Sequence, residues 1–372
     1  MKPLDAARAI GPELAARSAE IEAARTLPTD IAERIRDAEL FKVCVPRSYG
    51  GAELDPSSCM AVTEELAYHD GAAGWCQMIG STTGLLAGFL PPEHAEALFD
   101  PADAIGGGLA APMGEATRVD GGVRVSGRWQ WGSGTRHCTA IGGGVRFDGP
   151  PHAAFTFFDR ADVELLDTWH VAGLKGTGST DYVLSNAFVP EGRWVQLPGA
   201  SAVETGPLYR FSFFGLLAAG VASVALGLAR RAVDEVVALA AVKSPQGSSR
   251  PLAERAPVQA EVAQAEATAL AARALLDDVL GEAWAHVLAG DDPTDEHRRR
   301  IRLAATHATT AAAASVDRCY TAAGGAAVYE SSPLQRVFRD VHVATQHAMV
   351  APRTFELAGR LRLGLETDTR QL

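Results

Sequence analysis

The sequence predicts an α+β protein: an N-terminal helical domain over residues 1–103, a small central β-sandwich or barrel domain over 104–204, and a C-terminal four-helix bundle over 205–372. Two observations predict this order. Apolar residues recur at helical spacing in both outer parts, whereas the middle part alternates apolar and polar residues between glycines. With 372 residues and 47% hydrophobic content, the chain is long enough to bury a large core.

The first domain is predicted from helix-start signals and helical periodicity. The segment "IAERIRDAELF" carries apolar residues three and four positions apart. Asp55 followed by Pro56 is typical of a helix N-cap with a first-turn proline, and it precedes "SSCMAVTEELAYHD". We therefore expect helices throughout residues 1–103.

The central domain is predicted from short alternating segments. "VRVSGRWQW", "CTAIGGGVRF" and "HAAFTFFD" are typical of half-buried strands, and "VDGGV" at 119–123 is a hairpin signal. The last strand is expected to end near "VPEGRW". These features predict a small β domain that contains a hairpin.

The C-terminal part is predicted to hold four long helices, at 209–242, 257–289, 295–322 and 333–364. Residues 211–229 carry no charge over a length that suits a membrane span. The segment is rich in Gly, Ala and Ser, and its helix continues into the charged "RRAVDEVVALAA". We therefore expect a buried central helix and no membrane contact.

Charge and cysteine usage exclude several function classes. A formal net charge of −11 opposes nucleic-acid binding. The five cysteines are scattered without a C-x-x-C pair, which argues against disulfides and zinc, and the histidines show no metal-ligand spacing. The N-terminal segment lacks the features of a secretory signal. These observations predict a cytoplasmic protein without a metal.

Four motifs in a fixed order resemble those of the acyl-CoA dehydrogenase superfamily. They are "LFKVCVPRSYGG" at 40–51, "GRWQWGSGTRHC" at 127–138, "GLKGTGSTDY" at 173–182 and "AAGGAAVYESSPLQRVFRD" at 322–340. The resemblance covers essentially the whole chain. It implies an acyl-CoA dehydrogenase-like fold, a flavin cofactor and a homotetramer.

Several residues of these motifs have the chemistry of flavin contacts. Thr177 and Ser179 place hydroxyls between glycines, which suits the N5 or O4 edge of an isoalloxazine. Ser133 and Trp131 each precede a glycine at the end of a strand. Trp131 would flank the flavin face; the alternative is an aromatic of the core.

Three further residues are expected to bind the flavin. Gly324 and Gly325 would let backbone N–H groups approach a phosphate, although a plain helix C-cap turn is the alternative. Relatives that bind FAD place an arginine of a neighbouring subunit in the region where this chain has Arg250. The choice between FMN and FAD remains open.

The resemblance fails at the catalytic base. Most acyl-CoA dehydrogenases place a glutamate eight residues after the Arg-Asp pair, and a minority place it on the first bundle helix. Counting from Asp340 gives Ala348, and alignment of the first bundle helix gives Leu217. No Asp or Glu occurs at residues 341–355 or 205–233, so no neighbouring carboxylate replaces the base.

His347, preceded by Gln346, stands beside the missing glutamate. This pattern resembles the oxygenase components of two-component flavin-dependent monooxygenases. In that family a separate NAD(P)H-dependent reductase supplies reduced FMN or FAD, which reacts with O2 through a C4a-hydroperoxyflavin to hydroxylate a substrate. We expect His347 to donate to the reduced flavin or the peroxide and to titrate near neutral pH. The alternative is a histidine packed on a bundle face.

His137, in "SGTRHC", is the second candidate. In related aromatic hydroxylases a histidine in this setting lies beside the substrate, where it takes the phenol proton; a surface loop histidine is the alternative. The resemblance thus assigns catalytic roles to His137, His347 and Ser179 and implies a small aromatic or polyketide-like substrate. The expected pocket residues are Phe89, Trp169, Phe211 and Phe214.

Other functions remain open at this point. The chain could be an FAD-dependent acyl-thioester dehydrogenase or oxidase with a non-standard base, or a flavin-fold protein with only a structural role. The missing glutamate argues against the first and the hydroxyl-rich loop against the second. Within oxygenase chemistry, oxidation at nitrogen or sulfur is an alternative to hydroxylation at carbon.

Restoring the missing carboxylate tests the placement of residue 348. Ala348→Glu should not create an acyl-CoA dehydrogenase, because the substrate pocket and its orienting groups are also needed. It should slow substrate oxidation, since a carboxylate beside a partly anionic reduced flavin adds like-charge repulsion. Steady-state rates with reduced flavin measure this, and faster oxidation by the variant would contradict the placement.

Overall fold

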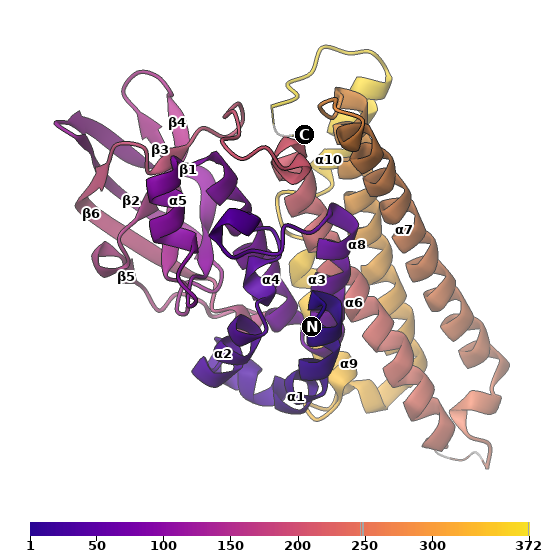
Figure 1. The fold of residues 1–372 in the computed structure, drawn as a ribbon. Helices are drawn as coiled ribbons and strands as arrows, with labels where there is room; N and C mark the ends of the chain where they lie inside the picture. The colour runs from indigo at the N-terminus through magenta and orange to yellow at the C-terminus, as the bar shows by residue number, and fades with distance from the viewer. Residues whose placement is uncertain (246, 248, 371) are drawn as a thin grey trace.

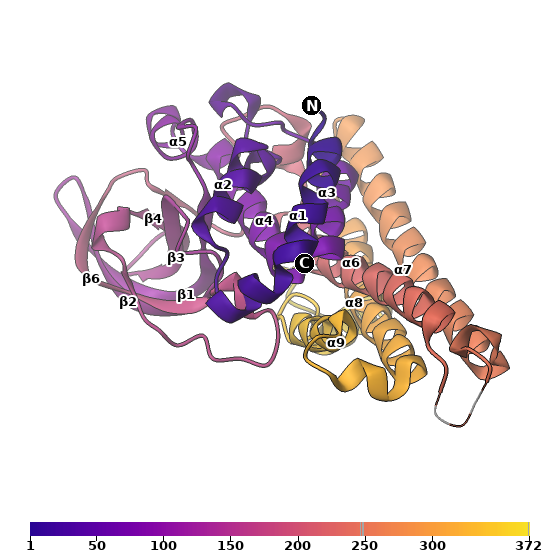
Figure 2. The same cartoon turned by 90° about the horizontal axis from the view of Figure 1, so that it is seen from below.

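A computed structural model describes residues 1–245, 247, 249–370 and 372. The N-terminal helices lie between the β sheet and the long helices of the C-terminal part, as Figures 1 and 2 show from two directions. This arrangement confirms the predicted α+β fold class. The candidate site residues come from the junction of these layers.

The N-terminal layer consists of α1 (Pro3–Ala24), α2 (Thr29–Asp37), α3 (Pro56–His69), α4 (Gly71–Gly84) and α5 (Pro92–Phe99). The predicted start of α3 is confirmed, because the side chain of Asp55 accepts a hydrogen bond from Ser58 N–H at 2.9 Å. Helix α4 is almost entirely buried. Its amide Gln77 is paired inside the core with Thr63 and with Leu40 O, so the burial leaves these polar groups satisfied.

The described strands form one hydrogen-bonded sheet in the order β5-β6-β2-β1-β3-β4-β7. They are β1 (Gly106–Val119), β2 (Gly122–Gly132), β3 (Ala140–Phe147), β4 (Ala153–Phe158), β5 (Glu164–Leu165), β6 (Thr180–Pro190) and β7 (Trp194–Val195). The β1–β3 pair is parallel and the other pairs are antiparallel. The predicted hairpin joins β1 to β2, and Gly121 in its turn has φ +72°.

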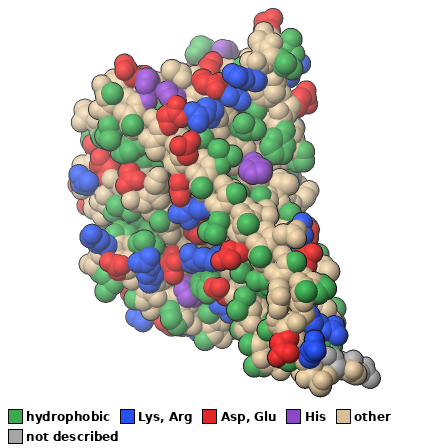
Figure 3. Space-filling model, turned by 90° about the vertical axis from the view of Figure 1, so that its right-hand side faces the viewer, with side chains coloured by type: hydrophobic (Ala, Val, Ile, Leu, Met, Phe, Trp, Pro, Cys, Tyr) green, Lys and Arg blue, Asp and Glu red, His purple; other side chains and the backbone are tan. Residues whose placement is uncertain are grey.

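The C-terminal part consists of α6 (Phe213–Val242), α7 (Ala256–Leu288), α8 (Asp295–Ala323), α9 (Pro333–Ala344) and α10 (Arg353–Arg362). Helix α6 is long and apolar enough to cross a membrane, but 78% of its most apolar stretch is buried by other helices. It is a core helix, as expected. On the outer face of the bundle, apolar side chains lie among charged ones (Figure 3).

The prediction of one helix over 333–364 is wrong at its centre. The chain leaves the helix after Ala344 and re-enters it at Arg353. Pro352 lacks a backbone N–H and disfavours helical geometry in the residue before it. Inside the break, Thr345 Oγ1 donates to His342 O at 2.7 Å. The break therefore places His347 in a turn rather than on a helix face.

Candidate active site

Three buried hydroxyls meet at the end of the sheet. Ser133 follows β2, and Ser179 immediately precedes β6. Because β2 and β6 are antiparallel with Gly132 opposite Thr180, the two serines are brought together. Ser179 Oγ lies 2.7 Å from Ser133 Oγ and 2.6 Å from Thr177 Oγ1. The hydroxyls expected to contact a flavin thus form one connected chain.

The loop that carries Thr177 and Ser179 has a tightly specified backbone. Leu174 and Gly178 adopt left-handed conformations with φ of +50° and +53°. Thr177 Oγ1 donates to Leu174 O at 2.8 Å, and Gly134 N–H donates to Thr177 O at 2.9 Å. A loop tied to its own first residue and to the end of β2 has little freedom to change the direction of its hydroxyls.

Trp75 is a site residue that sequence reasoning missed. Its Nε1–H donates to Ser133 Oγ at 3.0 Å, and its ring lies edge-on to His347 with the ring centroids 5.5 Å apart. The residue is 6% exposed on α4. An aromatic residue in a buried helix is usually part of the core, so nothing in the sequence around Trp75 indicated that its indole N–H would donate a hydrogen bond.

His347 is held in the turn between α9 and α10. Its Nδ1 accepts a hydrogen bond from Met349 N–H at 3.3 Å, so in the neutral ring the proton resides on Nε2. Arg302, buried on α8, donates to Met349 O from Nε at 3.3 Å and from Nη2 at 3.0 Å. The long helix α8 therefore fixes this turn and leaves His347 with one N–H donor.

The expectation that His347 titrates near neutral pH is wrong. Burial, assisted by the positive charge of Arg302, lowers the pKa of His347 to about 4. Removing imidazole from water penalises its charged form, and a neighbouring cation adds to the penalty. His347 is therefore a neutral hydrogen-bonding group throughout the physiological pH range.

His137 lies in the turn between β2 and β3, close to the ring of Phe41 at a centroid distance of 5.7 Å. Both of its ring nitrogens are buried and have no hydrogen-bond partner within the described residues. Gly134 makes room for the ring, because a Cβ there would lie 2.8 Å from Nε2. Burial lowers the pKa of His137 to about 4. A buried, unpaired donor and acceptor fit a site that awaits a polar ligand group.

The aromatic at the end of β2 is not a core residue. Trp131 is 60% exposed with φ +56°, whereas Trp129, two residues earlier, is fully buried and stacks on Tyr182 at a centroid distance of 5.3 Å. A positive φ is uncommon for a bulky side chain and marks a constrained position. Of the two interpretations of Trp131, core packing is excluded.

Gly324 and Gly325 lie at the end of α8. They belong to a different part of the chain from the loop that carries Thr177 and Ser179. A Cβ at either glycine would meet nothing within 4 Å, so the space beside this backbone is open. Lys243 Nζ donates to Ala323 O at 2.8 Å, and Lys243 O accepts from Leu252 N–H at 2.8 Å. These two bonds bring Lys243 to the end of α8 that precedes the glycines and bring Leu252 to Lys243.

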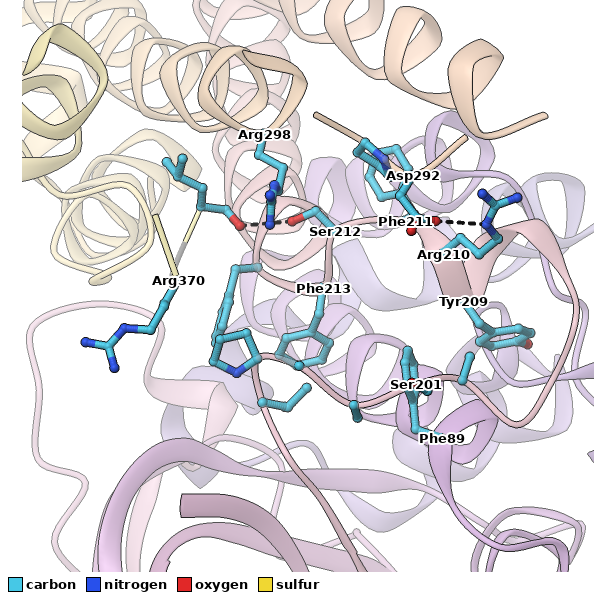
Figure 4. Close-up of a pocket in the computed structure, with 18 of the residues that line it drawn as sticks. Phe89, Ser201, Tyr209, Arg210, Phe211, Ser212, Phe213, Asp292, Arg298 and Arg370 are labelled. Carbon is cyan, nitrogen blue, oxygen red and sulfur yellow. Dashed lines mark hydrogen bonds and ion pairs between the residues drawn. The ribbon is translucent and has the colours of Figure 1, made fainter. Parts of the chain in front are cut away.

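A cavity of about 750 Å³ lies where the 197–214 segment crosses between η3 (Leu85–Phe89) and α8. Three of the four expected pocket residues, Phe89, Phe211 and Phe214, line it, and Figure 4 shows Phe89 and Phe211 among the lining side chains. The structure separates Trp169 from them: its Nε1–H donates to Leu174 O at 3.3 Å, on the loop before the hydroxyls. No cluster suited to a metal ion occurs in the part of the chain that the structure describes.

Comparisons with known proteins agree with this architecture. The models of the acyl-CoA dehydrogenase N-terminal and C-terminal domains match residues 5–91 and 219–352. Indole-3-acetate monooxygenase of Pseudomonas putida is 30% identical over 355 residues, which cover 94% of this chain and 90% of that protein. The oxygenase subunit HsaA, a flavin-dependent monooxygenase of Rhodococcus jostii, is 30% identical over 99% of this chain and 100% of its own.

A solved structure matches with similar coverage. XiaF from Streptomyces sp., in complex with FADH2 and glycerol, superimposes with a TM-score of 0.92 at 27% identity, covering 98% of this chain and 95% of that one. The chain belongs to the flavin-dependent monooxygenases of acyl-CoA dehydrogenase fold. Within that family it is an oxygenase component, which implies a separate flavin reductase as its partner. The finding favours an oxygenase over a thioester dehydrogenase.

The protonation of the two histidines is directly measurable. With pKa values near 4, His137 and His347 should stay neutral from pH 5.5 to 9. NMR of protein with 15N-labelled histidine should show two imidazoles without a titration shift in that range. The unfolded chain binds these protons near pH 6.5, so their contribution to stability is full above that pH and is lost as the pH falls toward 4. A midpoint near 6.5 for either ring would contradict the burial argument.

Proposed function

We propose that this oxygenase component hydroxylates a small aromatic or polyketide-like phenol. The observation that carries the proposal is His137, whose two ring nitrogens are buried without partners close to the hydroxyl chain of Ser133 and Ser179. A phenolic O–H satisfies the acceptor nitrogen of this ring, whereas a hydrocarbon leaves both nitrogens unpaired. The cavity of about 750 Å³ has an aromatic lining, but that lining includes none of Ser133, Ser179 and His137, so the proposal rests on His137 and not on the cavity.

The flavin-holding role falls to the hydroxyl chain. When bound in its reduced form, the flavin supplies the activation of O2 and the transfer of one oxygen atom to the substrate. Ser179, supported by Thr177 and Ser133, would hold the N5 or O4 edge, and the exposed Trp131 would flank the ring system. Trp75 keeps Ser133 oriented through its indole N–H.

The histidines divide the remaining tasks. His347 offers an N–H donor from a turn fixed by Arg302, and it would stabilise negative charge that develops near the flavin without itself titrating. His137 would accept the phenol proton, which makes the ring carbon beside the oxygen more nucleophilic. Both tasks require exclusion of water, and the burial of the ring nitrogens of His137 supports that condition.

The choice of flavin and the assembly complete the proposal. The open backbone beside Gly324 and Gly325, and the bond of Lys243 to Ala323 O just before them, support a role for these glycines in holding the phosphate arm of FMN or FAD, and we propose Arg250 as an arginine that reaches the flavin across a subunit boundary. Exposed Leu270 and Leu288 on α7 support packing of bundles in a homotetramer. Five buried free cysteines favour a cytoplasmic location.

Oxygen uptake with chemically reduced flavin tests the function as a whole. With reduced FMN or FADH2 and a panel of phenols, the protein should consume O2 in proportion to hydroxylated product. A thioester dehydrogenase would instead reduce added oxidised flavin in the presence of an acyl thioester. Uptake that yields only H2O2 with every phenol would overturn the proposed substrate class.

Ser179→Ala should lower the product formed per O2 consumed. One hydrogen bond of about 1 kcal/mol corresponds to about a fivefold change in the competition between oxygen transfer and release of H2O2. Ser331→Ala, at an exposed serine near the start of α9, is the matched control and should behave like the parent. Unchanged coupling in Ser179→Ala would remove this residue from the flavin edge.

The two histidine variants should affect different steps. His347→Ala should slow the reaction of bound reduced flavin with O2 at every pH, because a neutral donor is lost rather than a titrating group. His137→Ala should react with O2 at the parent rate and lose product yield to H2O2, because its partner is the substrate. Stopped-flow absorbance and product analysis separate the steps; loss of the same step in both variants would contradict the division.

A further inference from the structure

A buried carboxyl on α9 contacts the loop that carries the site hydroxyls. Asp340 is 6% exposed, and its Oδ1 accepts a hydrogen bond from Leu174 N–H at 2.5 Å. Its Oδ2 faces Gly71, where an added Cβ would lie 3.3 Å away. One side chain thus joins α9, the start of α4 and the loop before β6, three elements far apart in the sequence.

The hydrogen bond continues from Leu174 to the hydroxyl chain. Leu174 O accepts from Thr177 Oγ1 at 2.8 Å and from Thr177 N–H at 3.1 Å, and Thr177 Oγ1 lies 2.6 Å from Ser179 Oγ. Leu174 is held at φ +50°, a conformation that a branched apolar side chain adopts only when its surroundings impose it. Asp340 supplies the partner for the amide of this strained residue.

We propose that Asp340 is a positioning residue of the oxygenase reaction, because its carboxyl fixes the Leu174 peptide and thereby the direction of the Ser179 hydroxyl. The consequence for catalysis rests on the role proposed above for Ser179. The ordering of the loop by Asp340 does not depend on that role, since it is a property of the chain alone. The two parts can therefore fail separately.

The charged groups around Asp340 come from every element packed against it. They are Glu22 on α1, His69 on α3, Asp70 at the start of α4, Arg231 on α6, and Arg336 and Arg339 on α9 itself. Lys175, on the loop, pairs with Glu22 at 3.4 Å. Burial raises the pKa of Asp340 to about 7; the Leu174 hydrogen bond and Arg339 oppose the rise, and Asp70 and Glu22 add to it.

This environment gives the loop a pH response that His347 does not provide. Above about pH 7 the carboxyl is ionised and its bond to Leu174 N–H is charge-assisted, and below that pH the bond is weaker. The tighter loop at high pH comes with lower global stability. A raised acid pKa means that the folded state holds the proton more firmly, so stability falls as pH rises from about 4 toward about 7.

Hydrogen exchange of the flavin-free protein tests the loop directly. Three variants are compared with the parent: Asp340→Asn, which keeps the shape and one acceptor oxygen, Asp340→Ala, which removes the acceptor, and Asp317→Asn as a control. Asp317 is an exposed carboxylate on α8 that pairs with His342 on the solvent side of α9. The readout is amide protection in peptides covering residues 173–180 between pH 6 and 8.

Protection of the Leu174 amide, corrected for intrinsic exchange, should rise through pH 7 in the parent and in Asp317→Asn. In Asp340→Asn the protection should not change with pH. In Asp340→Ala it should be reduced by about fivefold, in line with the loss of one hydrogen bond. The melting temperature of Asp340→Asn should also exceed that of the parent, and the difference should be larger at pH 8 than at pH 5. Parent-like protection in Asp340→Ala at every pH would overturn the proposal.

The catalytic part has its own readout. Product formed per O2 should vary with pH around 7 in the parent and become independent of pH in Asp340→Asn, a change that a merely structural role would not produce. One outcome is that amide protection falls in Asp340→Ala while the product formed per O2 is unchanged in both Asp340→Ala and Ser179→Ala. In that case Asp340 orders the loop, and the proposed role of Ser179 is wrong. The opposite outcome is that Ser179→Ala forms less product per O2, while Asp340→Ala keeps the product yield and the amide protection of the parent. In that case only the Asp340 proposal is wrong.

Discussion

The chain of hydrogen bonds from Trp75 through Ser133 and Ser179 to Thr177 is the constraint on which the site depends. Hydroxyls buried between a sheet and a helical layer must pair with one another or with a ligand, because an unpaired buried polar group costs about 1–3 kcal/mol. Here they pair within the chain, and the helix, the end of β2 and the loop before β6 are held in one arrangement. Both ring nitrogens of His137, by contrast, are buried without a partner among the described residues, and we propose that the substrate completes their pairing.

The loss of the dehydrogenase base changes what this fold can do. A carboxylate beside the flavin removes a substrate proton, and it also places a negative charge where reduced flavin accumulates charge. Neutral histidines avoid that conflict. His347 is half-buried near Arg302, and partial removal from water together with the charge of Arg302 lowers its pKa; the same arginine holds the turn through Met349 O. One buried cation on α8 thus supports both the geometry of the turn and the charge state of the imidazole.

Much of the fold was predictable because its signals are local. The start of α3 at Asp55 and the hairpin at Gly121 follow from capping and turn chemistry, whereas the pairing of β2 with β6 that joins Ser133 to Ser179 was not predicted. Features that depend on contacts distant in the sequence were missed. The break after Ala344, the polar role of Trp75 and the low pKa of His347 arise from tertiary packing, which a periodicity argument cannot weigh. Asp340 was recognised as half of a family motif, but its bond to Leu174 spans 166 residues and has no local signature.

We propose that this chain, an oxygenase component, transfers one atom of O2 to an aromatic substrate. Isotope labelling tests it most directly: the protein is supplied with reduced flavin, 18O2 and a panel of phenols, and the products are analysed by mass spectrometry. We expect one 18O atom in each molecule of hydroxylated product, with none derived from water, and a yield that falls when His137 is replaced by alanine. Product oxygen that originates from water, or labelled product at full yield without His137, would contradict it.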